Sequence, residues 1–140
     1  MISITKQVQD RINAEGERDY PNETCGFLLG RIERNDVRES DDIIPVVNAR
    51  ETEEAYHRFV ILPQDFLKAE HEALAKNKNI IGIYHSHPDH PPIPSDYDLE
   101  HGLPFYSYLI LSVKDGKADK LTSWRLENDR SGFAAEELKV

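Results

Sequence analysis

The apolar run at residues 80–84, Ile-Ile-Gly-Ile-Tyr, indicates a β-strand with no solvent-facing side. It lacks the alternating polar residues of a half-exposed strand, so both of its faces need to be covered. A strand of this kind lies inside a sheet, between other layers of secondary structure. Since the remaining chain carries the patterns of both strands and helices, the sequence predicts an α/β or α+β fold.

Apolar periodicity and turn residues divide the rest of the chain into further elements. We predict helices over residues 4–14, 63–76 and 95–101, and strands over residues 25–32, 37–47, 59–62, 106–113 and 121–126. A polar segment covers residues 48–54, the four prolines of residues 88–94 exclude regular structure, and residues 132–140 fit either a strand or a helix. One side of the second helix should carry Phe66, Leu67, Glu70, Ala73 and Leu74.

Length and charge narrow the classes of protein to consider. We take residues 1–140 as a single domain, long enough for a hydrophobic core without disulfides, and its one cysteine cannot form one within the chain. With 26 acidic and 17 basic residues the net charge is −9, which disfavours nucleic acid as a partner. Apolar runs fall far short of the ~20 residues that span a bilayer, and residues 1–16 lack the apolar core of a signal peptide. We therefore expect no membrane partner and a cytoplasmic location.

Two histidines follow the buried strand directly. Residues two apart on an extended backbone project from the same face, so His85 and His87 can present both imidazoles to one point. The proline-rich loop after them turns back stiffly and can bring a carboxylate to the same point. Two neutral imidazoles, one carboxylate and a water form the open, four-coordinate site that is typical of catalytic rather than structural zinc.

Several residues of this segment also have other interpretations. Ser95 and Asp98 fit the N-cap and N3 positions of a short helix, which is compatible with metal binding because a helix start would orient both side chains. His90 is an alternative imidazole ligand, and Asp89 and Asp96 are alternative carboxylates. A His-x-His pair alone is common by chance and does not establish a metal site.

The complete segment resembles the metal-binding signature of the JAMM family, the MPN+ metalloproteases. That signature is His-x-His-Pro, six residues, then Ser-x-x-Asp, and its fixed elements stand here as His85, His87, Pro88, Ser95 and Asp98. The family also carries a glutamate ahead of a Gly-rich apolar strand, which is similar to Glu23 within Pro-Asn-Glu-Thr-Cys-Gly-Phe-Leu-Leu-Gly at residues 21–30. The resemblance extends over most of the chain, in the order of its predicted elements.

The resemblance implies a role for each matching residue. His85, His87 and Asp98 would bind one Zn²⁺ per chain, with a water in the fourth position. Glu23 would hydrogen-bond that water, act as general base, and then pass the proton to the leaving amine. Ser95 would help to stabilise the oxyanion of the tetrahedral intermediate. These roles agree with general chemistry, because zinc lowers the pKa of bound water to about 7 and polarises the scissile carbonyl.

The same resemblance implies a fold and a reaction. The fold would be a mixed central β-sheet flanked by helices, similar to cytidine-deaminase-like domains. The reaction would be zinc-dependent hydrolysis of a peptide or isopeptide bond after the C-terminal Gly-Gly tail of a ubiquitin-like or sulfur-carrier protein, as in the minimal, stand-alone prokaryotic members. The alternative is a non-catalytic scaffold or interaction domain of the MPN type, a kind of relative that lacks the metal ligands.

Other residues invite a functional interpretation but also have simpler ones. We expect Cys25 to be a core residue rather than a reactive thiol, and Trp124 to pack on a strand face. His57 can line a substrate groove, although a solvated histidine is the simpler interpretation. We assign His71 to the exposed side of the second helix, and His101 can approach the metal through the third helix.

Overall fold

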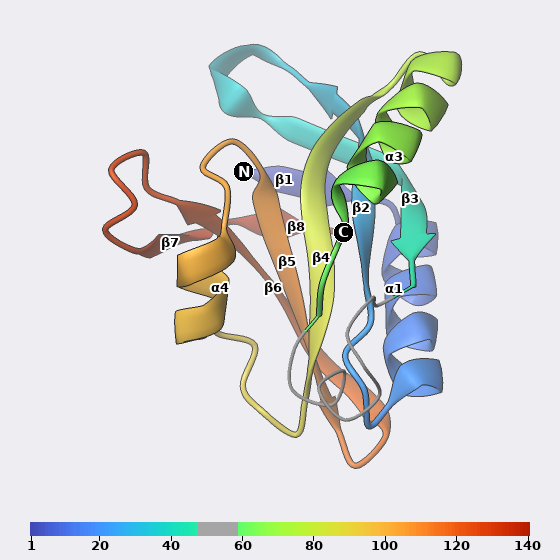
Figure 1. Ribbon diagram of the computed structural model, residues 1–140, viewed down its shortest axis with the longest axis vertical. Coiled ribbons are helices and arrows are strands. Elements are labelled where there is room, and N and C mark those ends of the chain that lie inside the picture. The colour runs from blue at the N-terminus through green and yellow to red at the C-terminus, as the bar shows by residue number, and fades with distance from the viewer. Residues whose placement is uncertain (48–58) are drawn as a thin grey trace.

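The computed structural model describes residues 1–47 and 59–140 and shows a β-sheet with helices packed against it (Figure 1). The predicted polar segment at residues 48–54 lies outside the described residues. In chain order the elements are β1 (Ile2–Ile4), α1 (Lys6–Asp19), β2 (Cys25–Ile32), the short 3-10 helix η1 (Arg34–Asp36), β3 (Arg38–Val46), α3 (Pro63–Ala75), β4 (Asn79–Pro88), α4 (Asp96–His101), β5 (Ser107–Lys114), β6 (Lys117–Leu126), β7 (Phe133–Glu136) and β8 (Leu138–Lys139).

The eight strands of the described residues form a single sheet in the order β7-β6-β5-β4-β2-β3-β1-β8. Strand β4 lies inside it, parallel to β5 and antiparallel to β2, so the sheet is mixed, as the family resemblance implies. Strands β7 and β8 are separated by Glu137 alone, yet β7 pairs with β6 at one edge and β8 with β1 at the other. The ambiguous C-terminal residues are therefore strands, and they bring the two edges of the sheet together.

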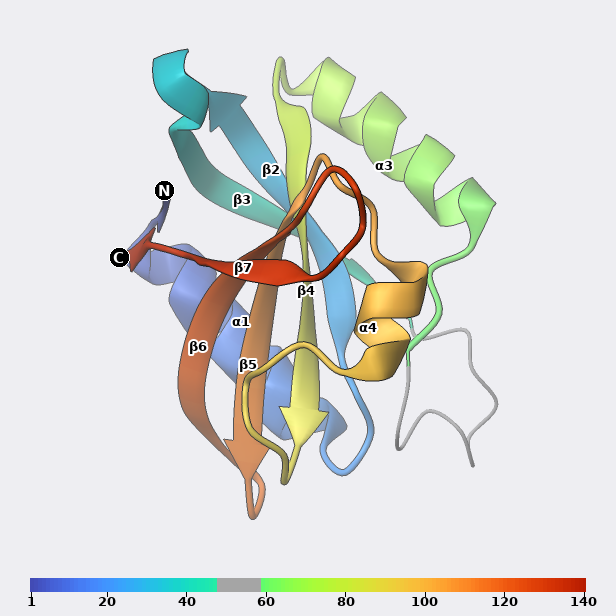
Figure 2. The same cartoon turned by 90° about the vertical axis from the view of Figure 1, so that its left-hand side faces the viewer.

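The central strand is covered on both faces, as predicted. Two hydrophobic clusters pack against the sheet, one with helix α1 and the other with helix α3. Ile81 and Tyr84 belong to the first cluster, and Ile80 and Ile83 belong to the second. The two helices lie in separate layers, with the strands between them (Figure 2). Strand β4 is thus fixed firmly enough to position residues at its end.

Helix α1 covers Lys6–Asp19 instead of residues 4–14. Thr5 is its N-cap, because the Thr5 hydroxyl accepts a hydrogen bond from the Val8 N–H at 3.1 Å. Ile4 has the helical spacing that predicted an earlier start, but it belongs to β1, which pairs with β3. Spacing along the chain does not distinguish a strand end from a first helical turn when the pairing strand is remote.

The strand predicted at residues 59–62 is wrong, since the structure shows no strand there. The Phe59 carbonyl accepts a hydrogen bond from the Tyr97 hydroxyl at 3.2 Å rather than from a neighbouring strand. Leu62 is already the N-cap of helix α3. Phe59 and Ile61 nevertheless pack against the second cluster, which explains why this segment is apolar.

The helices bury less apolar surface than the sequence pattern suggests. In α3 the stripe facing the sheet consists of Ala69 and Ala73 with the half-buried Phe66. Leu67 and Leu74 are 57% and 77% exposed, so they do not share the buried side. Within the part of the chain that the structure describes, no helix has the length and apolar character needed to cross a membrane.

Candidate metal centre

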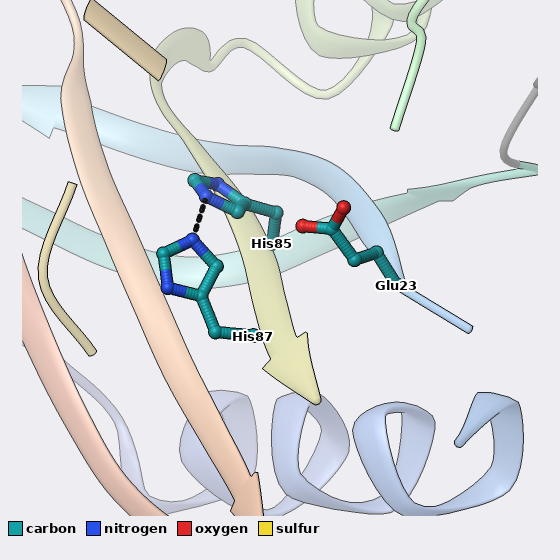
Figure 3. A group of neighbouring side chains, drawn as sticks. All are labelled: Glu23, His85 and His87. Carbon is teal, nitrogen blue, oxygen red and sulfur yellow. Dashed lines mark hydrogen bonds between the residues drawn. The ribbon is translucent and has the colours of Figure 1, made fainter. Parts of the chain in front are cut away.

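Strand β4 brings His85 and His87 together at its end. The strand continues through both histidines, so Pro88 ends it instead of opening the irregular loop. Both histidines are buried, and their Nε2 atoms lie 3.2 Å apart (Figure 3). The two imidazoles therefore meet at one point, as alternation along a strand predicts.

Helix α4 brings Asp98 to the same point. The Ser95 hydroxyl accepts a hydrogen bond from the Asp98 N–H at 3.1 Å, and the Asp98 carboxylate accepts one from the Ser95 N–H at 2.9 Å. This reciprocal capping box confirms the predicted helix start. The same carboxylate lies 3.2 Å from Nε2 of His85 and 3.2 Å from Nε2 of His87. Capping the helix and facing the histidines are therefore compatible.

Asp98 is a buried carboxylate whose charge is stabilised by its neighbours. Burial by itself raises the pKa of Asp98, whereas the charge of His85 and the hydrogen bonds donated by protonated His85 and His87 and by the Ser95 N–H all lower it. The lowering effects prevail, so the pKa of Asp98 lies well below its ordinary value. The carboxylate is therefore ionised at neutral pH, which is the form that binds metal ions.

The Pro91 carbonyl determines which nitrogen of His87 carries a proton. Its oxygen lies 2.9 Å from Nδ1 of His87, and because a carbonyl only accepts, Nδ1 is the donor. In the neutral ring Nε2 then keeps a lone pair, on the side that faces Asp98 and His85. Histidines that bind metals are commonly oriented in this way, with the outer nitrogen donating to a backbone carbonyl.

A cation suits the chemistry of this group. Three potential metal ligands, Nε2 of His85, Nε2 of His87 and the Asp98 carboxylate, lie 3.2 Å from one another. Ligands at about 2.0–2.1 Å from a tetrahedral zinc ion are roughly 3.3–3.4 Å apart, which is close to this spacing. The three side chains could therefore hold an ion of that size with little rearrangement.

Glu23 lies beside the histidines, just before β2. Its side chain is buried and points toward His85 (Figure 3). Ligand atoms of Glu23, His85 and His87 lie within 4.8 Å of one another, so this trio could also hold a metal. Asp98 meets both histidines at 3.2 Å, which favours Asp98 as the third ligand and leaves Glu23 able to act on a molecule bound there.

Ser86, between the two histidines, secures the segment that carries Glu23. The Ser86 hydroxyl accepts a hydrogen bond from the Thr24 N–H at 2.8 Å, and the Ser86 N–H donates to the Thr24 carbonyl at 3.1 Å. Strands β2 and β4 also pair here, with Cys25 opposite His85. These contacts fix the chain on either side of the candidate centre.

Replacing Ser86 by alanine is expected to destabilise the protein by about 1–3 kcal/mol, because the buried Thr24 N–H loses its acceptor. Glu23 should also shift away from the histidines, so any hydrolytic activity should fall while bound metal is retained. Urea unfolding and zinc analysis of S86A measure the two effects. The control is S107A, which removes another fully buried hydroxyl, one that has no hydrogen-bond partner among the described residues. Wild-type stability in S86A would show that the hydroxyl does not secure Thr24.

A cavity of about 350 Å³ opens beside His87. Its lining includes Glu23, His87, Ser95 and Asp98, together with prolines of the β4–α4 loop. The Ser95 side chain is exposed, and because its oxygen accepts from the backbone, its proton remains available to a bound group. Glu23 and Ser95 therefore border the same cavity.

The alternative carboxylates lie away from this point. The Asp89 carboxylate accepts hydrogen bonds from the Tyr20 hydroxyl at 2.5 Å and the Asp115 N–H at 2.9 Å, so it faces these two residues rather than the histidines. Asp96 is exposed in the first turn of α4. Of the three aspartates in this segment, the structure therefore brings Asp98 to the histidines.

The remaining histidines have separate positions. His90 is exposed and lines the 350 Å³ cavity, so it borders the candidate centre. His101 is exposed, with its ring stacked on Tyr97 and its Nδ1 3.1 Å from the Tyr97 carbonyl. His71 is exposed on α3, as expected, and His57 lies outside the described residues.

Phe59 contacts the candidate centre and Tyr97 binds Phe59, although the sequence predicts neither contact. The Phe59 ring stacks on the His85 imidazole, with ring centroids 4.6 Å apart. The Tyr97 hydroxyl donates to the Phe59 carbonyl at 3.2 Å and so connects α4 to the segment before α3. No local pattern marks these contacts, because they join residues that are remote in sequence.

Cys25 and Trp124 are packing residues, as predicted. Cys25 is fully buried, and its thiol donates to the Val46 carbonyl at 3.6 Å. Burial raises the pKa of Cys25 to about 12, so the thiol stays protonated and is a poor nucleophile. Trp124 is half-buried and packs against the second cluster.

Comparison with known proteins identifies the family. The family described as prokaryotic homologs of the JAB domain matches residues 5–127. A desampylase of Haloferax volcanii is 36% identical over 122 residues, which cover 83% of each protein. A desampylase of Pyrococcus furiosus is 38% identical over 78 residues, and this match covers 56% of the chain but only 50% of that protein. The chain therefore belongs to the prokaryotic JAB-domain homologues, as a member of the JAMM/MPN family.

Solved structures agree with this assignment. A protein of Desulfitobacterium hafniense is 30% identical and superposes with a TM-score of 0.85, over 99% of this chain and 91% of that one. A JAB1/MPN domain protein of Archaeoglobus fulgidus is 19% identical and has a TM-score of 0.61, over 100% of this chain and 96% of that one. The second likeness shows that the fold is that of JAB1/MPN domains.

Proposed function

We propose that this protein is a zinc-dependent hydrolase that cleaves the peptide or isopeptide bond after the C-terminal Gly-Gly tail of a ubiquitin-like protein. Ubiquitin-like sulfur carriers with such a tail are included in this substrate class. The observation that carries the proposal is the meeting of His85, His87 and Asp98 at mutual distances of 3.2 Å, beside Glu23. A JAMM-type isopeptidase is also the class of enzyme that the family match and the desampylase relatives support.

Each side chain at the centre would have a separate role in the reaction. His85, His87 and Asp98 would hold one Zn²⁺, which supplies Lewis acidity for activating water and polarising a carbonyl. Glu23 takes a proton from the attacking water and delivers it to the leaving amine as the C–N bond breaks. Ser95 donates a hydrogen bond to the carbonyl oxygen as that oxygen gains negative charge.

The substrate tail should be extended and small next to the bond that breaks. The carbonyl under attack has to approach buried atoms at the end of β4, and glycine allows this approach where a Cβ would clash. The 350 Å³ cavity accommodates a short stretch of chain, so the folded part of the substrate would dock outside it. A net charge of −9 favours a docking partner with basic residues.

A panel of substrates tests this function. Each would be a folded ubiquitin-like domain joined to a lysine side chain or to a peptide, with Gly-Gly, Ala-Ala or bulky residues before the bond. We expect cleavage of the Gly-Gly substrates only, loss of cleavage after treatment with a chelator, and recovery when zinc is added. Equal cleavage of the Ala-Ala and bulky tails would contradict the proposed groove, and cleavage unaffected by chelation would contradict the zinc chemistry.

Salt should distinguish docking of the folded domain from binding of the tail. We expect kcat/KM for a basic folded substrate to fall as sodium chloride rises, because screening weakens attraction to the acidic protein. An unstructured peptide with the same tail and no basic residues should react more slowly and depend less on salt. Equal rates for both substrates at low salt would indicate a general peptidase without a docking surface.

A further inference from the structure

The loop between β4 and α4 is secured from strand β6. The Pro92 carbonyl accepts hydrogen bonds from the Thr122 hydroxyl at 2.6 Å and from the Trp124 indole N–H at 3.2 Å. The indole N–H also lies 2.9 Å from the Thr122 oxygen, so it is shared between the two acceptors. Figure 2 shows this loop in yellow, passing beside β5 before it returns to α4. Two side chains of a distant strand therefore bind one carbonyl of the loop.

The positions of Thr122 and Trp124 in the sheet suit this contact. They are two residues apart on β6, so their side chains share one face of the strand. The Thr122 hydroxyl has one proton, and the Pro92 carbonyl is much closer than its other acceptor, the Ile110 carbonyl at 3.4 Å. The hydroxyl therefore donates to the loop and accepts from the indole.

The geometry of Pro92 couples the direction of its own carbonyl to the direction of the Pro91 carbonyl, which contacts His87. The Pro91 carbonyl, which accepts from Nδ1 of His87 at 2.9 Å, is the neighbour of the anchored Pro92 carbonyl. Between the two carbonyls lie a planar peptide unit, the φ angle of Pro92, which its ring fixes at about −65°, and one rotatable ψ angle. Fixing the second carbonyl thus confines the first to a narrow range of directions.

We propose that Thr122 and Trp124 are positioning residues for His87. By binding the Pro92 carbonyl they keep the Pro91 carbonyl aimed at Nδ1, and hence keep Nε2 aimed at Asp98 and His85. This inference rests on the proposed function, because it takes His87 as a zinc ligand. Groups that orient a metal-binding histidine from outside commonly change metal affinity by about 10–100-fold.

The two donors partly replace each other, which predicts a graded series of variants. In T122V, which is nearly isosteric, the indole can still donate to the Pro92 carbonyl, and in W124F the hydroxyl can. We therefore expect the double variant T122V/W124F to bind zinc about 10-fold more weakly, at the lower end of the usual range, and each single variant to lose less. T122S keeps the hydroxyl and should bind zinc like the wild type.

Zinc affinity measured by competition with a chromophoric chelator tests the inference on the whole chain. The matched control is S123A, which removes the hydroxyl of the residue between Thr122 and Trp124; that hydroxyl lies on the opposite face of β6 and donates to the Glu136 carboxylate at 2.9 Å. A second readout is the exchange of the His87 Nδ1 proton with water, followed by NMR in the zinc-loaded proteins. This exchange should be faster in the double variant and unchanged in S123A. Thermal melting confirms that each variant is folded.

The possible outcomes separate the two proposals. Wild-type zinc affinity and proton exchange in a folded T122V/W124F would overturn the positioning role while leaving the proposed function intact. Equal losses in S123A would also overturn it, because the effect would then belong to strand β6 in general. Failure of the wild-type protein to bind zinc would instead overturn the proposed function, and this inference with it.

Discussion

Glu23→Gln is expected to lower kcat by about 10²–10⁴-fold, the usual contribution of a positioned general base. Glutamine has the shape of glutamate but cannot take a proton from the attacking water. Because Asp98, rather than Glu23, meets the histidines at 3.2 Å, the variant should keep one zinc per chain and its stability. Turnover of an isopeptide-linked substrate, together with elemental analysis, measures both effects.

The matched control for this experiment is Glu100→Gln. Glu100 is exposed on α4, close in sequence to Asp98, and the same chemical change there should leave turnover unaffected. Near wild-type turnover in E23Q would refute the general-base role. Loss of zinc in E23Q would instead assign Glu23 to the metal, as the second possible trio of Glu23, His85 and His87 allows.

His87→Ala is expected to abolish activity by removing zinc, because the side chain supplies one of three proposed ligands. The affinity loss should exceed the ~10–100-fold typical of groups that only orient a ligand. His90→Ala is the control, since His90 lines the same cavity but is exposed. The two variants are compared by their zinc content after dialysis against a weak chelator. Full zinc occupancy in H87A, or loss of zinc in H90A, would refute the assignment of His87 as a ligand.

The sequence predicts those parts of the fold that depend on local pattern. The strand at Cys25–Ile32 has the predicted bounds, and the apolar run at residues 80–84 lies inside the sheet, as its composition requires. Strand β1 was not predicted because its three residues depend on pairing with β3 and β8, both remote in sequence. Residues 59–62 have strand-like composition but form no strand, because the Phe59 carbonyl binds the Tyr97 hydroxyl and Leu62 is the N-cap of α3.

The candidate site likewise has parts that local sequence pattern predicts and parts that depend on remote residues. The meeting of His85 and His87 follows from alternation along a strand, and the orientation of Asp98 follows from helix capping, both of which can be recognised in sequence. The choice of Asp98 over Asp89 and Asp96 rests on the resemblance to the JAMM signature. The contributions of Phe59 and of the Pro91 carbonyl could not be predicted. One depends on a ring brought in from a remote segment, and the other depends on a backbone direction in a loop.

The most direct test of the metal centre is anomalous diffraction at the zinc absorption edge, from crystals of the wild-type protein grown with zinc. We expect one strong peak per chain, about 2.0–2.1 Å from Nε2 of His85 and of His87 and about 2.0–2.2 Å from an Asp98 oxygen. The Glu23 carboxylate should lie beyond bonding distance from that peak. A peak bound by Glu23 in place of Asp98, or no peak between the histidines at full zinc supply, would contradict the proposed centre.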